Sequence, residues 1–354
     1  MGIFSKKSKS LLGLEISSTA VKIVELSKAG NNFRVERYIV ESLPQNAVIE
    51  NTIADIDQVS STIARAVKRS GASTKNVATA VSGSHVIVKR IFMPRGLRDE
   101  ELEGQISLEA DHYIPYPLDE VNIDFEVIGP STENPNEDEI LLAACRKEIV
   151  DDYIAVIEQG GLTPTVLDVE SFAMENSYEQ IAQSQPGGGM NRVVALLDFG
   201  ATTLHVNILH NNKSIYTRHH TFGGNQLTEE IQRRYGLSFE EAAQAKKVGG
   251  LPDNYQPEIL RPFMEAMCQE AMRGLQFFYS SSPHDSVDSV LLAGGCAQIQ
   301  GIDEMLSEKI NVPVDVANPF ANMSLSPKLK PQSLALDAPS LMIACGLALR
   351  GVKK

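Results

Sequence analysis

The 354-residue chain has no tryptophan, only four cysteines and no excess of positive charge. The cysteines, Cys145, Cys268, Cys296 and Cys345, lack the spacing of a metal site or a disulfide framework, which predicts small buried side chains in a reducing compartment. The formal net charge of −13 argues against a general nucleic-acid binder, because backbone phosphates would repel such a surface. No run approaches the ~20 apolar residues that a membrane span needs. These absences predict a cytosolic protein.

The length of the chain predicts two to three domains of ordinary size. Its first ten residues, MGIFSKKSKS, carry Lys6, Lys7 and Lys9, and strand-like residues rather than a secretory apolar region follow them. We interpret this segment as a solvated tail, with a weak membrane-surface contact as the alternative.

Two stretches that lie 183 positions apart share one pattern. Residues 13–24 read GLEISSTAVKIV and residues 196–207 read LLDFGATTLHVN, so that Glu15 aligns with Asp198 and Thr19 with Thr202. Each copy predicts an apolar strand, one acid, a turn of small or hydroxyl residues and a second alternating strand.

Such a hairpin suits a nucleotide. Backbone amides in a turn without bulky side chains can approach phosphate oxygens closely. An acid at the strand end can hold a hydrated Mg²⁺, which prefers carboxylates, water and phosphate. Ordinary hairpin turns also favour these residues, so one copy alone would not indicate a site. Two copies in register, each near the start of one half of the chain, predict a pair of hairpins that clamp one ligand.

The rest of the pattern divides the chain into lobes. Residues 1–85 alternate strand and helix, which is typical of an α/β layer. Residues 86–167 predict a β-α-β-β-α-β module, whose last helix is Ile149–Gln159 and whose last strand is Thr163–Asp168. The segment Gln183–Asn191 reads as a linker.

After this linker the second half predicts a lobe over 189–339. Within it we expect a helical part at about 226–280, with Asn225 as the N-cap of its first helix. Residues 318–339 read as irregular, and an apolar helix within 340–354 is expected to return to the first lobe, which also includes 168–188. The turn Ala293-Gly294-Gly295, between a buried strand and a helix, lacks side chains that would keep a flat base from lying on the backbone.

This order of features resembles the actin, sugar-kinase and Hsp70 ATPase superfamily over nearly the whole chain. The module at 86–167 looks like subdomain 1C of the bacterial cell-division protein FtsA. The strings LLGLEISSTAVKIVEL, LEADHYIPYPLDEVNIDFEVIG and LLDFGATTLHVNIL are similar to the PilM family of actin-like type IV pilus assembly proteins. The resemblance implies a two-lobed, actin-like α/β fold, a duplicated ribonuclease H-like architecture with an inserted 1C-type subdomain.

The resemblance also implies site residues. Asp198 and Glu15 would serve a hydrated Mg²⁺, and Glu170 would take the place of a residue that positions attacking water. Lys246 would contact the adenosine end of ATP, and Ala344 and Gly346 would permit a close helix crossing at the hinge. The remaining positions that match nucleotide-binding motifs of the superfamily are Ser17, Ser18, Thr19, Gly200, Ala201, Thr202, Gly223, Gly224, Gly294 and Gly295.

Two departures from the superfamily pattern bear on chemistry. Glu15 and Ser17 stand where relatives usually have Asp and Gly, and Ala243 stands where they often have Glu. A longer acid and an added β-carbon would shift phosphate and metal geometry. We therefore expect ATP binding with at most slow hydrolysis. His205, His219 and His220 lack a carboxylate or cysteine at ligand spacing, and we expect no metal or catalytic role for them.

By this resemblance the chain is expected to be a cytoplasmic scaffold at the inner face of the inner membrane, needed for pilus biogenesis and twitching motility. It would dock the cytoplasmic N-terminal tail of a PilN-type protein in a groove beside 86–167, with other pilus inner-membrane or motor components and self-association as further contacts. One alternative is an active ATPase or phosphotransferase, for which Glu170 is the sole candidate base. The other is an FtsA-like filament protein, which usually has a C-terminal amphipathic helix that we do not find after Leu349.

Overall fold

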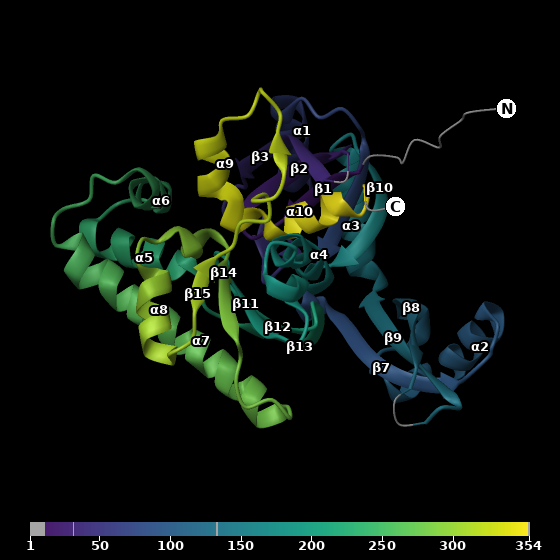
Figure 1. Ribbon diagram of the computed structural model, residues 1–354. Coiled ribbons are helices and arrows are strands. Elements are labelled where there is room, and N and C mark those ends of the chain that lie inside the picture. Colours follow the sequence, from purple (N-terminus) through teal and green to yellow (C-terminus); the bar gives the residue numbers. More distant parts are fainter. Residues whose placement is uncertain (1–10, 31, 132–133, 353–354) are drawn as a thin grey trace.

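The computed structural model describes residues 11–30, 32–131 and 134–352, and it shows two lobes and a smaller projecting subdomain (Figure 1). The three lysines of the first ten residues lie outside the described part of the chain. The first lobe contains a six-stranded sheet in the order β10-β6-β1-β2-β3-β16. Its strands are β1 Leu12–Ile16, β2 Ala20–Ala29, β3 Asn32–Ser42, β6 Asn76–Val81, β10 Thr163–Val169 and β16 Ser324–Leu325.

The second lobe repeats this arrangement. Its five-stranded sheet has the order β13-β12-β11-β14-β15, which matches β3-β2-β1-β6-β10 strand for strand. In both sheets an antiparallel hairpin opens the lobe and parallel strands follow it on the other side. The strands are β11 Val193–Phe199, β12 Leu204–His210, β13 Lys213–His220, β14 Ser289–Ala293 and β15 Val314–Val316. The predicted two-lobed, duplicated α/β fold is confirmed.

Each sheet carries helices of its own lobe on one face. In the first lobe α1 (Ile56–Ser70) begins where Asp55 accepts a hydrogen bond from the Gln58 amide and ends at the left-handed Gly71, as its capping residues require. In the second lobe the covering helices bury a core of Leu, Ile, Phe and Met side chains against β11 and β12. They are α5 Gly224–Tyr235, α6 Phe239–Val248, α7 Arg261–Ser281 and α8 Ile302–Ile310.

The projecting subdomain is smaller than predicted. It is a three-stranded sheet in the order β7-β9-β8 with α2 (Asp99–Glu109) packed on it, and it has a hydrophobic core of its own (Figure 1). The strands are β7 Val86–Pro94, β8 Val121–Pro130 and β9 Glu137–Arg146.

The assignment of the last helix and strand of 86–167 to this module is wrong. The helix α3 (Lys147–Gln159) buries Tyr153 and Val156 in the core of the first lobe, beside α1. The strand β10 pairs in parallel with β6 of the first-lobe sheet. The subdomain therefore ends near Arg146.

The C-terminal part of the chain returns to the first lobe earlier than expected. Within 318–339, predicted as irregular and as part of the second lobe, β16 pairs with β3 and α9 (Pro331–Asp337) buries Leu334 against the first lobe. The segment Pro331–Leu349 is long and apolar enough to span a membrane by length and composition, contrary to the sequence expectation, but 67% of that window is buried inside the protein. Its apolar side chains thus serve the core of the lobe.

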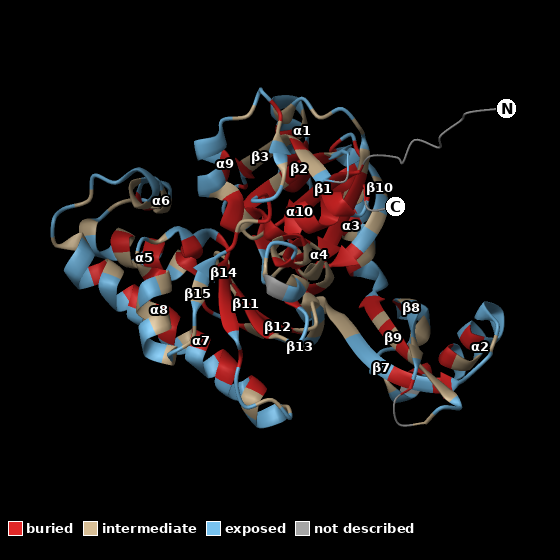
Figure 2. Cartoon of the chain, viewed as in Figure 1, coloured by how far each residue is buried: buried red, intermediate tan, exposed pale blue. Residues whose placement is uncertain are grey.

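Two helices join the lobes. The helices α4 (Glu170–Ala182) and α10 (Met342–Leu349) cross between the sheets, and their side chains form one core with strands of both lobes (Figure 2). A Cβ on Gly346 would lie 1.7 Å from the Ala173 carbonyl oxygen, and one on Gly13 would lie 1.9 Å from the Ala344 carbonyl oxygen. The predicted close helix crossing is therefore present, and it depends on absent side chains.

The helix α5 also differs from expectation. Its N-cap is Gly223 rather than Asn225, so the helix begins a residue before the predicted cap. The Gly224 and Asn225 amides donate to the carbonyl oxygens of Gly200 and Ala201, which ties this helix N-terminus to the second hairpin turn.

Candidate functional site

The two hairpins have the same backbone geometry. Ser17 N donates to Ala20 O at 2.9 Å in the first turn, and Gly200 N donates to Thr203 O at 3.0 Å in the second. In the first hairpin Glu15 pairs directly with Lys22 across the strands. The repeat seen in the sequence is therefore a repeat of structure as well.

The two turns meet between the lobes. Ser18 Oγ and Thr202 Oγ1 lie 2.9 Å apart and form a hydrogen bond, although 184 positions separate them. The Ser17 hydroxyl is used within its own turn, where it donates to Ala20 O, and the Thr19 carbonyl accepts from the Leu43 amide. A ligand that occupies both turns must therefore lie where Ser18 and Thr202 now face each other.

Three acids and one lysine lie close together beside these turns. Lys22 Nζ lies 2.6 Å from Glu15 Oε1 and 2.8 Å from the carbonyl oxygen of Ser340, just before α10. Asp198 and Glu170 are close enough for their charges to act on Lys22 and Glu15. The second oxygen of Glu15 is buried without a hydrogen-bond partner among the described residues.

The pKa values show a site that is short of positive charge. Burial, with the negative charges of Glu15 and Asp198, raises the pKa of Glu170 to about 8. Burial likewise raises the pKa of Asp198 to about 6, although Lys22 opposes this rise. For Lys22 burial lowers the pKa, but the charges of Glu15, Asp198 and Glu170 outweigh it and the net shift is upward. The arrangement would be stabilised by a cation.

The residues predicted for the adenosine end lie at the second lobe. Lys246 Nζ donates to Gly224 O at 2.8 Å and to Thr228 Oγ1 at 2.6 Å, so it holds the start of α5. Burial lowers the pKa of Lys246. Cys296, which the sequence did not place here, lies beside this lysine, and burial raises its pKa to about 11, so the thiol is unreactive at neutral pH.

Glycines leave room around this part of the site. A Cβ on Gly294 would lie 2.3 Å from both Asp198 Oδ1 and Phe199 O, and one on Gly223 would lie 2.5 Å from Ala201 O. Gly294 also has a φ of +84°, which L side chains rarely adopt. Gly295, next along the turn, is exposed. The turn predicted to carry a base therefore requires glycine at Gly294 and presents backbone to solvent at Gly295.

The predicted metal site can be tested against this geometry. Within the described residues there is no group of three or more His, Cys, Asp or Glu side chains placed to hold a metal ion. Mg²⁺ commonly binds through one or two carboxylates, with waters and substrate phosphates as its other ligands. An orphaned Glu15 oxygen and two acids of raised pKa fit a cation of that kind, and they do not fit a cage made by protein alone.

The sequence analysis missed Lys22. All the predicted acids and both turns come together, and Lys22 is the cation among them. A signal was present, because this lysine, seven residues after the acid, interrupts the apolar run Ala20–Val24 at the start of the strand.

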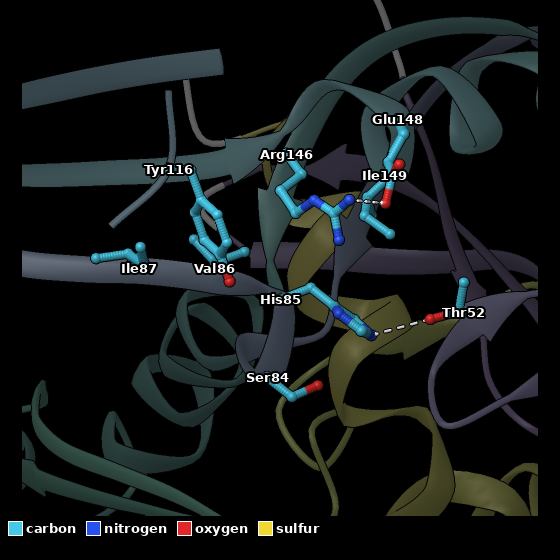
Figure 3. A pocket seen from close by; sticks show the side chains of 9 residues that line it. All are labelled: Thr52, Ser84, His85, Val86, Ile87, Tyr116, Arg146, Glu148 and Ile149. Carbon is cyan, nitrogen blue, oxygen red and sulfur yellow. Dashed lines mark hydrogen bonds and ion pairs between the residues drawn. The ribbon is translucent and has the colours of Figure 1, made fainter. Parts of the chain in front are cut away.

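A second feature lies between the first lobe and the projecting subdomain. It is a pocket of about 190 Å³, in which Tyr116 faces Arg146, with the guanidinium 5.9 Å from the ring centre (Figure 3). Arg146 also pairs with Glu148 at 2.6 Å. The lining residues are Thr52, Ser84, His85, Val86, Ile87, Tyr116, Arg146, Glu148 and Ile149.

Two duplicated lobes with facing hairpins define an actin-like protein. The chain belongs to the PilM family of type IV pilus assembly proteins, whose family model matches residues 13–352. It is similar to the solved structure described as the PilM-PilN type IV pilus biogenesis complex, at 30% identity and a TM-score of 0.82, over 98% of this chain and 99% of that one.

More distant structures share the fold. The ethanolamine utilization protein EutJ from Carboxydothermus hydrogenoformans matches at 16% identity and a TM-score of 0.53, over 96% of this chain and 89% of its own. MreB5 of Spiroplasma citri, bound to ADP, matches at 11% identity and a TM-score of 0.50, over 97% of this chain and 96% of its own. The predicted membership of the PilM family is confirmed.

Proposed function

We propose that this chain is a nucleotide-binding cytoplasmic scaffold of a type IV pilus assembly complex, docked to the cytoplasmic N-terminal tail of a PilN-type inner-membrane protein. The observation that carries this proposal is the similarity to the PilM-PilN complex over almost the whole of both chains. Docking of this kind would hold a protein of net charge −13 at the inner face of the membrane without a lipid-binding element. Pilus biogenesis and twitching motility would then depend on it.

The pocket beside the projecting subdomain is the docking site that we propose. An extended peptide can bind between two β-layers through its backbone, with side chains filling pockets. Tyr116 is 42% exposed, and an exposed aromatic ring beside an arginine suits such an anchor.

Point variants test this site better than deletion of 86–167, because α3 and β10 belong to the first-lobe core. A fluorescent peptide with the N-terminal tail sequence of the cognate PilN-type protein would be titrated by anisotropy. We expect Tyr116→Ala to weaken binding by about tenfold or more. Arg261→Ala, which alters an exposed residue of α7 in the other lobe, should bind as the unaltered protein does. Equal affinity of the peptide for all three proteins would show that the docking site is not at Tyr116.

For the site between the two hairpin turns, which we call the cleft, we propose ATP with Mg²⁺ as the ligand. Glu15 and Asp198 would serve the hydrated metal ion, which supplies charge neutralisation beside the phosphates. The turn residues Ser18 and Thr202 would give up their mutual hydrogen bond to receive phosphate oxygens. Lys246, Gly294 and Gly295 would form the adenosine end.

Substitution of Asp198 tests the metal-dependent part of this site. We expect Asp198→Ala to weaken binding of Mg²⁺-ATP at least tenfold in calorimetry, while metal-free ATP binds no worse, because the acid repels phosphates in the absence of a cation. Asp151→Ala, an exposed acid on α3, is the control. Unchanged affinity for Mg²⁺-ATP in the Asp198 variant would remove Asp198 from the site.

Hydrolysis is proposed to be slow. A general base must be ionised, and the raised pKa of Glu170 leaves that group largely protonated at neutral pH. Steady-state turnover of about one per second or more, in the usual range of enzymes, would favour an active ATPase instead.

A further inference from the structure

Basic charge gathers at the two ends of this acidic chain. The end segments, residues 1–10 and 353–354, contain five lysines and no acid. The body between them, residues 11–352, contains 27 of the 32 Lys and Arg and all 45 Asp and Glu. The net charge of −13 therefore combines a body of −18 with end segments of +5. Both end segments lie outside the described residues, but Leu11 and Val352, to which they are attached, are described.

The two points of attachment lie side by side on the first lobe. Leu11 directly precedes β1, and Gly351 and Val352 follow α10, which packs across β1 (Figure 1). A Cβ on Gly351 would lie 2.6 Å from the Leu11 nitrogen, and one on Gly13 would lie 2.5 Å from the Ala348 nitrogen. The fold therefore attaches the two groups of lysines, which stand at opposite ends of the sequence, at one place on the surface.

Two acids near this place are already paired with arginines. Glu25, opposite the first residue of β1 in the sheet, pairs with Arg37 at 3.2 Å. Asp168 of β10 pairs at 2.6 Å with Arg350, which directly precedes the second point of attachment. Lys75, two residues before the β6 residue that pairs with the start of β1, is exposed and adds a cation. These pairs leave the charge of the end segments free to act on an external surface.

The composition of the first end segment suits an anionic bilayer. Anionic lipids give the cytoplasmic leaflet a negative surface, and each lysine close to it strengthens binding about fivefold. Ile3 and Phe4 precede the lysines, and apolar residues beside basic ones can enter the boundary between headgroups and acyl chains. The same lipids repel a body of −18, so attraction requires lysines that extend from one place.

This place lies within reach of the proposed docking pocket. The helix α3, 13 residues or about 20 Å long, lines the pocket with Glu148 and Ile149 at its start. The strand after it, β10, begins at Thr163, which pairs with Asn76, next to the residue that pairs with the start of β1. Ten residues span at most about 35 Å. One bilayer can therefore hold a docked membrane protein and contact the lysines.

We propose that the end segments form an electrostatic contact with the anionic surface of the bilayer, with Ile3 and Phe4 inserted at the headgroup boundary. The contact turns the start of β1 and the end of α10 toward the membrane. It does not depend on docking of a membrane-protein tail, although each contact strengthens the other where both are present. Residues 1–10 are thus more than the solvated tail expected from the sequence, because the fold attaches Lys353 and Lys354 beside them.

Cosedimentation with vesicles tests this contact on the full chain, with no residues added at either end. Vesicles of phosphatidylcholine with about one third phosphatidylglycerol would be compared with phosphatidylcholine alone. We expect at least about tenfold stronger binding to the anionic vesicles at about 50 mM NaCl, and loss of this preference at about 500 mM. Binding that does not distinguish the two kinds of vesicle would refute the proposal.

Two triple variants test whether the location of the lysines matters. Replacing Lys6, Lys7 and Lys9 together by glutamine should weaken binding to anionic vesicles about tenfold or more. The matched control replaces Lys309, Lys328 and Lys330, exposed lysines of the body, and changes the net charge equally. It should bind as the unaltered protein does. Equal binding of both variants would refute the contact, and this result would follow if the lysines bound the acidic body instead.

A fluorescent label tests the orientation. Thr163→Cys, exposed beside the start of β1, and Ser280→Cys, exposed on α7, would each carry an environment-sensitive fluorophore, since the four native cysteines are buried. Anionic vesicles should shift the emission of the first label to shorter wavelength and leave that of the second unchanged. Equal shifts, or none, would refute the orientation. Failure of the proposed tail docking would change none of these results, because the vesicles contain no protein.

Discussion

Replacement of Glu170 by glutamine tests the charge balance of the cleft directly. Glutamine has nearly the shape of a protonated glutamate, so the variant fixes Glu170 in its neutral form. A pKa of about 8 instead of 4.5 means that the folded protein holds this proton more tightly than the unfolded chain does. The corresponding stability is fully present below about pH 4.5 and is lost as the pH rises through about 8.

The size of the effect follows from the same shift. The full rise corresponds to about 5 kcal/mol as an upper limit. Carboxylates that repel each other move apart and admit water as they ionise, so we expect the variant to be more stable than the unaltered protein by about 2–3 kcal/mol at pH 8.5. At pH 5 the folded group is neutral in both proteins and only the unfolded glutamate has begun to ionise, so the difference should shrink to less than about 1 kcal/mol.

Urea denaturation followed by far-UV circular dichroism, at pH 5, 7 and 8.5, measures this difference. Glu158→Gln, an exposed glutamate on α3, is the control and should follow the unaltered protein at every pH. If the free energies of unfolding of Glu170→Gln and the unaltered protein differ by the same amount from pH 5 to 8.5, ionisation of Glu170 does not destabilise the folded protein. The reasoning from burial and from the charges of Glu15 and Asp198 would then be refuted.

Two further substitutions test the packing and pairing around the cleft. Lys22→Met should destabilise the protein by about 2–4 kcal/mol in urea denaturation, because it leaves Glu15 buried and unpaired. Adding Glu15→Gln should restore most of the lost stability. A double variant no more stable than Lys22→Met alone would contradict this. Gly346→Ala should lower stability by at least about 2 kcal/mol in thermal unfolding, because its Cβ would overlap Ala173 O, whereas Gly104→Ala, in α2 with no described atom within 4 Å, should gain about 0.5–1 kcal/mol. Equal melting temperatures for Gly346→Ala and the unaltered protein would show that the helices can separate at no cost.

The hairpins could be predicted from the sequence because the residues that specify each of them are close together in the chain. An acid, a run of small residues and two alternating strands lie within twelve positions, so the turn at Ser17–Thr19 and that at Gly200–Thr202 could be found without knowledge of the fold. Which residue lies opposite each acid depends on the register between the two strands of the hairpin. Lys22 and His205 were missed as partners of the acids because the pattern was read for the turns and not for the residues opposite them.

The boundary of the projecting subdomain could not be found in this way. Local patterns predicted the helix α3 and the strand β10 correctly, but they say nothing about which sheet a strand joins. Pairing of β10 with β6 connects residues more than 80 positions apart. A topological argument was available, since two parallel strands need a crossover helix between them and α3 is that helix. The same limit applies to β16, whose two residues pair with β3 across most of the chain.

The cleft is connected to both helices that join the lobes. Glu170 is the first residue of α4, and the Ser340 carbonyl that accepts from Lys22 lies just before α10. The neighbouring Pro339 carbonyl accepts from the Gly294 amide in the turn of the second lobe. The nucleotide that we propose would draw Lys22 toward a phosphate and neutralise the acids, and it would therefore act at the start of both helices at once. Because these helices cross with Gly346 against Ala173, they have little room to slide, and we expect a change at the cleft to move the lobes as units.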